Sequence, residues 1–394
     1  MVRDHPKPLR LRGCHYATSK KVDVVVDGER ILSIVNAADD AVDLEADWIA
    51  PALFDLQING CNGRSFNSPK LTVDDVRHVV AACHRHGIAG FCPTLITNSY
   101  EALLHGFSTI RRACETDSLV GRAAPGLHLE GPYISPEDGP RGAHPLQHVR
   151  PPDWDEFCRW QEASGDRIRL ITLAPEHDKA IQFIEKLTDS GVVVALGHTA
   201  ARPECVRAAV AAGARLSTHL GNGCHAVLPR HDNYLWEQLA NDQLWASVIA
   251  DGHHLPTAVL RSILRAKTPG RTILTCDASS LAGLPPGRYR EWDQELEVLA
   301  DGRVVVPGTP FLAGSGVFTE TCVASLLSLG EASLSEVFTM ASNRPRKLLG
   351  LEPRALQPGD VADLILFDWK PGKVFELKAT IIAGRPVESY DGAA

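Results

Sequence analysis

A regular alternation of short apolar segments with amphipathic ones is the feature that most constrains the fold of this chain. The amphipathic stretches, such as 73–87 and 202–213, have the spacing of helices that cover a sheet. Strands that alternate with helices indicate a parallel sheet. Eight strand–helix units in a row predict an α/β fold of the TIM-like (β/α)8 barrel type. The predicted strands lie at 52–57, 90–95, 125–131, 169–175, 192–199, 215–221, 246–252 and 272–278.

The two ends of the chain differ from the middle because both carry short β-like runs broken by turns. One is VDVVVDGERILSIV, in which Asp27-Gly28 has the composition of a hairpin turn. We therefore expect a small β-sandwich domain built from 1–51 and 357–394, with the barrel as the catalytic domain at 52–356. A β-hairpin insertion is expected after the last barrel strand, within 283–310.

Polar side chains gather where the predicted barrel strands end, and in a (β/α)8 barrel the chemistry lies at the carboxyl ends of the strands. One carboxylate with two imidazoles is a common ligand set of catalytic Zn²⁺, which lowers the pKa of a bound water toward about 7. A second carboxylate, Asp277, is a candidate to accept and donate the proton. The residues at these ends are Glu130, His198, His219, Asp251, His253, His254 and Asp277.

Each of these residues alone has a simpler explanation. A lone His198 would more often be a satisfied polar residue, Glu130 a carboxylate beside a Gly-Pro turn, and Asp277 a helix N-cap. Their conjunction favours a site, because burying several charges in one mouth is costly unless they bind a metal or each other. By contrast, His84, His86 and His105 fall on helical stretches and are expected to be solvated.

The first predicted strand raises a question about metal binding. Alternate residues of a strand point the same way, so Asp55, Gln57 and Asn59 share one face. Many metal-dependent hydrolases carry His-x-His at such a position, whereas Gln and Asn are poor metal ligands. Either the metal has been lost or it binds elsewhere.

Composition excludes several classes of function. The chain has 394 residues, 44% of them hydrophobic, and a net charge of −8, so nothing suggests a nucleic-acid or membrane partner. Residues 1–10 lack the apolar core of a signal peptide, and no run of apolar residues is long enough to span a bilayer. The ten cysteines include no CxxC pair, which favours reduced thiols and a cytoplasmic location.

Over nearly its whole length the chain resembles the N-acetylglucosamine-6-phosphate deacetylases of the amidohydrolase superfamily. HLEGP followed by GAHP is the most specific feature, whereas GDVADL is shared more widely in the superfamily. The resemblance implies a (β/α)8 barrel with a small β-sandwich, and hydrolysis of N-acetylglucosamine-6-phosphate to glucosamine-6-phosphate and acetate. The matching segments are PALFDLQINGCNG, GLHLEGPYISPEDGPRGAHP, LGHTAA, STHLGNGC, IADGHHL, LTCDA, LAGSG, ASNRPRKLLGL and PGDVADLILFD.

The resemblance also implies a role for individual residues. The implied metal ligands are Glu130, His198 and His219, with Asp277 as the catalytic acid and base. The implied substrate contacts are His144 and His254 at the sugar and scissile amide, Asn222 and Gly223 near the sugar phosphate, Arg230 at the phosphate from the partner subunit of a homodimer, and Leu312, Ala313 and Gly314 at the acetyl pocket.

With Gln57 and Asn59, the chain resembles the members of the family that hold one metal rather than two. The expected cofactor is therefore one divalent ion per subunit, with Zn expected first and Fe or Co accepted by the same ligands. Gln57 and Asn59 would form the floor of the pocket.

Some positions depart from the family pattern and keep alternatives open. Gly223-Cys224 stands where many members have Ala-Met, and His-Asp-Asn follows Arg230 in place of Pro-Gly. Trp236 and Trp245 nearby are expected to pack on helices, and Arg230 could equally form a salt bridge in a dimer. The alternatives are a deacetylase of another acetamido sugar, phosphorylated or not; an N-acyl-amino-acid or dipeptide hydrolase; and a barrel with a dead site that serves as a sugar-binding or regulatory protein.

Overall fold

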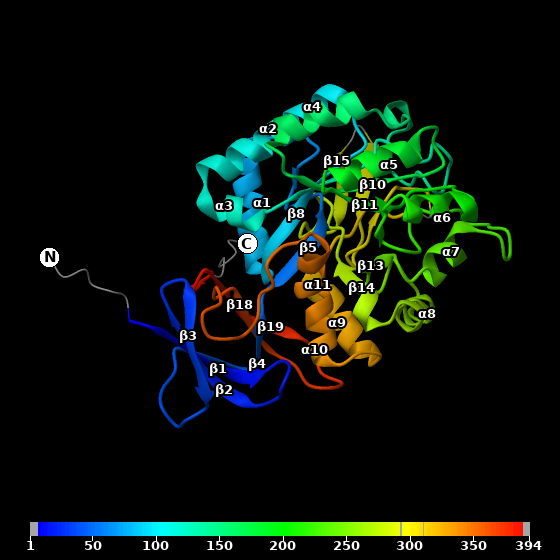
Figure 1. Ribbon diagram of the computed structural model, residues 1–394. Coiled ribbons are helices and arrows are strands. Elements are labelled where there is room, and N and C mark those ends of the chain that lie inside the picture. The colour runs from blue at the N-terminus through cyan, green and yellow to red at the C-terminus, as the bar shows by residue number, and fades with distance from the viewer. Residues whose placement is uncertain (1–6, 292–293, 310, 389–394) are drawn as a thin grey trace.

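The computed structural model describes residues 7–291, 294–309 and 311–388. Its centre is a sheet of eight parallel strands that follow one another around the sheet in chain order (Figure 1). Each strand coincides with one of the eight predicted segments, so the predicted (β/α)8 architecture is confirmed. The strands are β5 (Leu53–Ile58), β8 (Ile88–Ile96), β9 (Leu127–Glu130), β10 (Ile168–Leu173), β11 (Val193–Leu196), β12 (Leu216–Ser217), β13 (Trp245–Ile249) and β14 (Thr272–Thr275).

The barrel closes where its first and last strands meet. β5 and β14 stand at the two ends of the strand order, and a parallel bridge between Ile58 and Ala278 joins them. Apolar side chains of the strands, among them Phe54, Leu170 and Ile273, form one buried cluster. The barrel interior is therefore a packed core, and polar side chains are concentrated at its carboxyl end.

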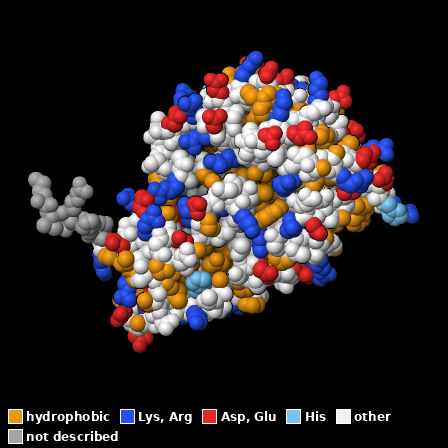
Figure 2. Space-filling view, in the orientation of Figure 1, with side chains coloured by type: hydrophobic (Ala, Val, Ile, Leu, Met, Phe, Trp, Pro, Cys, Tyr) orange, Lys and Arg blue, Asp and Glu red, His pale blue; other side chains and the backbone are white. Residues whose placement is uncertain are grey.

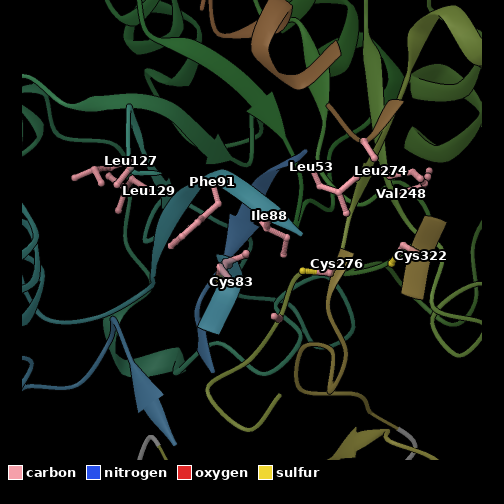
Figure 3. Close-up of a cluster of buried hydrophobic side chains, with 14 of the residues drawn as sticks. Leu53, Cys83, Ile88, Phe91, Leu127, Leu129, Val248, Leu274, Cys276 and Cys322 are labelled. Carbon is pink, nitrogen blue, oxygen red and sulfur yellow. The ribbon is translucent and has the colours of Figure 1, made fainter. Parts of the chain in front are cut away.

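Helices surround the barrel because each buries an apolar face against the strands. Figure 3 shows part of this core, with Leu53, Phe91 and Leu274 from strands, Cys83 from α1 and Cys322 from α9. The helices are α1 (Val73–Arg85), α2 (Tyr100–Thr116), α3 (Ser118–Ala123), α4 (Trp154–Ser164), α5 (Ala180–Asp189), α6 (Pro203–Ala211), α7 (Tyr234–Ala240), α8 (Thr257–Lys267), α9 (Thr319–Leu329), α10 (Leu334–Met340) and α11 (Asn343–Leu348), with short 3-10 turns at Leu146–His148 and Pro269–Arg271.

Both ends of the chain contribute to one mixed seven-stranded sheet beside the barrel, shown in blue and red in Figure 1. β4 and β18 pair antiparallel, with Ile49 opposite Leu366, and so join the two ends. The predicted turn at Asp27-Gly28 connects β2 to β3. The sheet order is β20 (Arg385–Pro386), β19 (Glu376–Ile382), β18 (Leu364–Asp368), β4 (Leu44–Pro51), β1 (Leu9–His15), β2 (Lys21–Asp27) and β3 (Arg30–Asn36).

The division into a terminal domain and a barrel domain stays a prediction. Ile365 and Phe367 of the terminal sheet belong to the same buried cluster as the barrel helices, so the apolar core continues between the two. The parts of the predicted terminal domain at 1–6 and 389–394 lie outside the described residues.

The insertion after the last barrel strand is a three-stranded antiparallel sheet, one strand more than the predicted hairpin. It consists of β15 (Gly287–Glu291), β16 (Gln294–Val298) and β17 (Val304–Val305). A further hairpin, β6 (Gly60–Cys61) with β7 (Arg64–Ser65), follows the first barrel strand. Within the predicted insertion, residues 292–293 and 310 are outside the described part of the chain.

One sequence expectation about histidines is wrong. His84 of α1 is 7% exposed, and its Nε2 has no hydrogen-bond partner among the described residues. His86 and His105 are half-buried: His86 stacks on Phe318, and His105 bonds the backbone oxygen of Leu71.

The face that Figure 2 shows has no large patch of one charge that would suit a strongly charged partner. Lys and Arg are interspersed there with Asp and Glu. Among the helices of the described residues, none is long and apolar enough to cross a membrane.

Candidate active site

The carboxyl ends of the barrel strands surround a cavity of about 360 Å³. Glu130 is the last residue of β9, and His198, His219 and Asp277 each lie two residues beyond the end of their strand. The sequence-predicted residues that line the cavity are Asn59, Glu130, His144, His198, His219, Asn222, Gly223, His253, His254, Asp277, Leu312, Ala313 and Gly314. Gln57 donates hydrogen bonds to two of these residues, Glu130 and Asp277, and Arg230 lines a different hollow.

Three buried groups converge on one point of this cavity. Nε2 of His219 lies 3.1 Å, and Nε2 of His198 3.2 Å, from Oε1 of Glu130. The two ring nitrogens are 3.1 Å apart. In a tetrahedral zinc site with metal–nitrogen bonds of about 2.1 Å, neighbouring ligand atoms are roughly 3.4 Å apart. The spacing of these three atoms is close to that separation.

The tautomer of His198 supports the same conclusion. Its Nδ1 lies 2.8 Å from the backbone oxygen of Pro140, which can only accept a hydrogen bond, so Nδ1 carries a proton and Nε2 is the ring nitrogen that would face a cation. Such a bond to the second nitrogen is the usual way in which proteins orient a metal-binding imidazole. Two imidazole nitrogens and a carboxylate oxygen facing one point are satisfied by a cation, so these residues fit a divalent metal.

His144 is a further candidate ligand near the same point. The ligand atoms of Glu130, His144 and His198 all lie within 4.8 Å of one another, and Nε2 of His144 is 3.8 Å from Oε2 of Glu130. Nδ1 of His144 lies 2.8 Å from Oγ1 of Thr97. Burial, and next the charge of His198, lowers the pKa of His144 to about 3, so its ring is neutral. The shorter distances favour His219 over His144 as the third ligand.

The electrostatics of Glu130 and His219 suit metal binding. Burial alone would raise the pKa of Glu130, but hydrogen bonds from His198 and His219 outweigh it and hold the pKa well below its usual value. Burial lowers the pKa of His219. The carboxylate is therefore ionised and the imidazole neutral, which are the forms that bind metals.

Asp277 faces the same cavity, and the amides of the first strand hold it there. Nδ2 of Asn59 donates a hydrogen bond of 2.7 Å to Oδ1 of Asp277. Nε2 of Gln57 donates to the same oxygen at 3.0 Å and to Oε1 of Glu130 at 2.8 Å. Together, Gln57 and Asn59 thus supply hydrogen-bond donors to both carboxylates.

The environment of Asp277 favours its protonated form when no cation is near. Burial, followed by the negative charge of Glu130, raises the pKa of Asp277 well above its usual value. A positive charge beside Glu130 would lower that pKa again. Both hydrogen bonds that the described residues donate to the carboxylate of Asp277 end on Oδ1, which leaves Oδ2 for a proton transfer.

Strained backbone marks three of these residues. His198, His219 and Asp277 have φ of +51°, +29° and +53°, in the left-handed region that side chains other than glycine rarely adopt. Such conformations cost of order 1–3 kcal/mol each and gather at functional sites. Here they turn the side chains from the ends of three strands toward one cavity.

His254 is held by an aspartate from the same strand end. Its Nδ1 lies 2.7 Å from Oδ2 of Asp251, whose Oδ1 accepts the backbone N–H groups of His253 and His254. Burial opposes the charge of Asp251, but the hydrogen bond from His254 outweighs it and lowers the pKa of Asp251 to about 2. The bond fixes the ring at the cavity wall.

The loop after β12 lies directly on a candidate metal ligand. Gly223 has φ of +55°, and a Cβ atom there would lie 2.8 Å from Nδ1 of His198. Asn222 donates to the backbone oxygen of His219 at 3.3 Å. A glycine at this position lets the loop approach the imidazole closely.

Arg230 lies away from the cavity. It is exposed and lines an apolar hollow together with Leu228, Trp236 and Val259. Trp236 is 55% exposed, and its indole N–H donates to the backbone oxygen of Arg230, so the expectation that this tryptophan packs on a helix is wrong.

Several cavity residues were not found by sequence reasoning. Ile96 and Phe311 line the wall, and Thr97 bonds His144. Ile96 and Thr97 stand at the carboxyl end of β8, so the strand-end rule applied to that strand could have found them. The contact between Pro140 and His198 carries no local signal, because the two are far apart in the chain.

Comparison with known proteins gives consistent results. The model of the amidohydrolase family matches residues 48–387. N-acetylglucosamine-6-phosphate deacetylase of Homo sapiens is 36% identical, over 98% of this chain and 97% of that protein. N-acetylgalactosamine-6-phosphate deacetylase of Escherichia coli O157:H7 is 31% identical, over 82% of this chain and 84% of that protein.

The structural comparison covers the chain to a similar extent. A mutant of N-acetyl-D-glucosamine-6-phosphate deacetylase from Mycobacterium smegmatis, in complex with N-acetyl-D-glucosamine-6-phosphate, superposes with a TM-score of 0.87 and 28% identity. The alignment covers 97% of this chain and all of that chain.

Proposed function

From the premise that this chain belongs to the amidohydrolase family, we propose that it is a metal-dependent deacetylase of N-acetylglucosamine-6-phosphate. The products are glucosamine-6-phosphate and acetate. The observation that carries the proposal is the convergence of the ligand atoms of Glu130, His198 and His219 within 3.2 Å of one another, with Asp277 in the wall of the same cavity.

Glu130, His198 and His219 would hold one divalent ion per subunit. Zn²⁺ is the first expectation for two imidazoles and a carboxylate, and Fe²⁺ or Co²⁺ suits the same donors. When bound, the ion lowers the pKa of a water molecule and polarises the acetyl carbonyl. Gln57 and Asn59 form the floor of the site and hold Asp277 and Glu130 through their amides.

The residues of this chain supply the proton transfers. Asp277 accepts a proton on Oδ2 from the attacking water and passes it to the nitrogen of the leaving amine. Amide cleavage then gives acetate and the free amino sugar. His144, neutral and held by Thr97, is placed to donate a hydrogen bond to the acetyl oxygen.

The remaining cavity residues would bind the sugar. His254, fixed by Asp251, and Asn222 with Gly223 would contact the sugar and its phosphate, while Leu312, Ala313 and Gly314 would enclose the acetyl group. Arg230 would reach the phosphate of a partner subunit. The apolar hollow around Arg230, with exposed Trp236, is the surface on which a homodimer would form.

A second candidate is a deacetylase of a related acetamido sugar. The segment GNGCHAVLPRHDN departs from the usual family pattern where the phosphate would lie, and one relative at 31% identity is named for N-acetylgalactosamine-6-phosphate. The chemistry would be unchanged, because Glu130, His198, His219 and Asp277 are all present. For the same reason a dead site is disfavoured.

A cytoplasmic location is part of the proposal. All ten cysteines fall within the described residues and all are free thiols. Unpaired thiols in this number are typical of a reducing compartment.

Acetate release by the Zn²⁺-loaded protein tests the function. We expect turnover of N-acetylglucosamine-6-phosphate well above that of N-acetylglucosamine and of N-acetylgalactosamine-6-phosphate. Asp277→Asn should keep its metal, measured by elemental analysis, and lose about 10²–10⁴-fold in kcat. A preference for another acetamido sugar would support the second candidate function. Full activity of Asp277→Asn would contradict the proposed role of Asp277.

A further inference from the structure

A fully buried carboxylate below the site is not used by the mechanism above. Asp55 is 0% exposed and precedes Gln57 by two residues on β5. Its Oδ1 accepts hydrogen bonds from the hydroxyl of Thr275 and from the backbone N–H of Gln57, the latter at 2.9 Å. Its Oδ2 accepts the backbone N–H of Cys276 at 2.9 Å and the hydroxyl of Thr319 at 2.6 Å.

These four bonds fill the acceptor capacity of the group. An ionised carboxylate offers about four lone-pair positions, and each one here has a donor. Burial raises the pKa of Asp55 above its usual value, although the two hydroxyl and two amide donors favour the ionised form and oppose that rise. A charge is costly to bury unless it is satisfied in this way, so the surrounding chain is built to receive it.

The bonds of Asp55 cross the seam of the barrel. Within the described residues, the first and last strands meet through the single bridge of Ile58 with Ala278. Thr275 ends β14 and Cys276 follows it, so two bonds from Asp55 hold the end of the last strand to the first. The side chain thus adds hydrogen bonds across a seam where the backbone supplies few.

Each bond of Asp55 also leads into the active site. Cys276 directly precedes Asp277, and Gln57 donates to both Asp277 and Glu130. Thr319 is the first residue of α9, and the cavity residues Leu312–Gly314 end five residues before it. Three segments that lead to the cavity wall are therefore bonded to one carboxylate, which precedes Gln57 by two residues on β5.

We propose that Asp55 is a positioning residue for the hydrolysis, which sets the place of Asp277 relative to Glu130 without touching the substrate. This inference rests on the proposed function for its kinetic readout. Asparagine is nearly isosteric, but its amide nitrogen cannot accept a hydrogen bond. In Asp55→Asn that NH2 group replaces one carboxylate oxygen and therefore faces the donors that bonded this oxygen. The end of β14 should then shift or loosen.

The kinetic test compares Asp55→Asn with a matched control. Asp23→Asn removes an equally buried carboxylate, which pairs with Arg12 in the terminal sheet away from the site. For Asp55→Asn we expect kcat to fall at least tenfold, KM to change less than threefold, and one metal ion to remain bound. Asp23→Asn should lower the melting temperature and keep kcat. A kcat of Asp55→Asn equal to that of the wild type or of the control overturns the proposal.

Milder variants keep the test decisive if Asp55→Asn does not fold. Thr275→Val and Thr319→Val preserve volume and remove one donor each, and Thr319→Ser restores the hydroxyl. We expect kcat to fall at least threefold in the two valine variants and to recover in Thr319→Ser. Unchanged kcat in both valine variants would contradict the proposal.

Hydrogen exchange gives a readout that does not depend on activity. In Asp55→Asn, peptides covering 53–59 and 272–278 should exchange faster than in the wild type, while peptides of the terminal sheet should not change. If the wild type releases no acetate from any acetamido sugar, the proposed function fails. Hydrogen exchange is then the remaining test of whether Asp55 positions the end of β14. Equal exchange at 272–278 would then overturn the positioning role.

Discussion

Gly223 illustrates how one residue without a side chain can control a ligand. Its φ of +55° and the 2.8 Å that would separate a Cβ atom at this position from Nδ1 of His198 are two distinct constraints. The first is a backbone preference and the second is a contact.

We therefore predict that Gly223→Ala weakens metal binding by about 10–100-fold, the usual effect of disturbing the groups that orient a metal ligand. The measurement is Zn²⁺ affinity by competition with a chelator. Gly28→Ala is the matched control, because Gly28 has the same φ of +55° and no atom within 4 Å of its Cβ position. It should cost about 1 kcal/mol of stability and leave the metal affinity unchanged. Equal affinities for both variants would show that the contact with His198 has no effect.

At the scale of elements, α1 carries a titratable group into the core. His84 is buried, and burial lowers its pKa from 6.5 to about 4. Gly87, just after this helix, packs closely on Ile365 of the terminal sheet, so α1 lies between the barrel and that sheet. Protonation of His84 would place a charge in this apolar layer.

His84 should make the protein less stable in acid. Its folded pKa lies below its unfolded pKa, so between pH 6.5 and 4 the unfolded chain binds the proton and the folded chain does not. Stability is therefore lost as the pH falls through this window, by about 2–3 kcal/mol at pH 4.5 for a shift of this size. His84→Gln cannot titrate, so its urea midpoint should fall less than that of the wild type between about pH 7.5 and 4.5. Parallel losses in the two proteins would refute the assignment.

At the scale of the whole molecule, the proposed homodimer accounts for the position of Arg230. This side chain is exposed beside an apolar hollow and does not line the cavity with the other predicted substrate contacts. An arginine suits a phosphate because its planar fork donates two hydrogen bonds. It can act on the substrate only if a second subunit brings it there or if its loop moves.

Subunit mixing distinguishes these two cases. Arg230→Ala and Asp277→Asn homodimers should both be poorly active. A heterodimer of the two has one site with intact Asp277 that receives Arg230 from the other subunit. We predict that purified heterodimers, made by coexpression with different tags, recover about half of the wild-type kcat/KM. No gain over the Arg230→Ala homodimer would mean that Arg230 acts within its own chain or not at all.

The sequence alone determined the barrel and the strand ends, because both follow from local periodicity. Glu130 and Asp277 could be placed at strand ends from the pattern of the residues around them, and parallel strands bring such ends together. A β-rich unit built from both ends of the chain was foreseen for the same reason, although as a sandwich and not as one seven-stranded sheet. Roles within the site came from the resemblance, and they stay predictions until the variants are measured.

Only the tertiary structure decided which groups lie opposite one another. The bonds of Asp55 to Thr319, of Thr97 to His144 and of Pro140 to His198 join residues that are distant in the chain. The burial of His84 likewise depends on the sheet that packs over α1. The periodicity of a helix or strand predicts which face a side chain occupies. The partner of that side chain depends on how remote segments meet in space, which is set by packing of the whole chain.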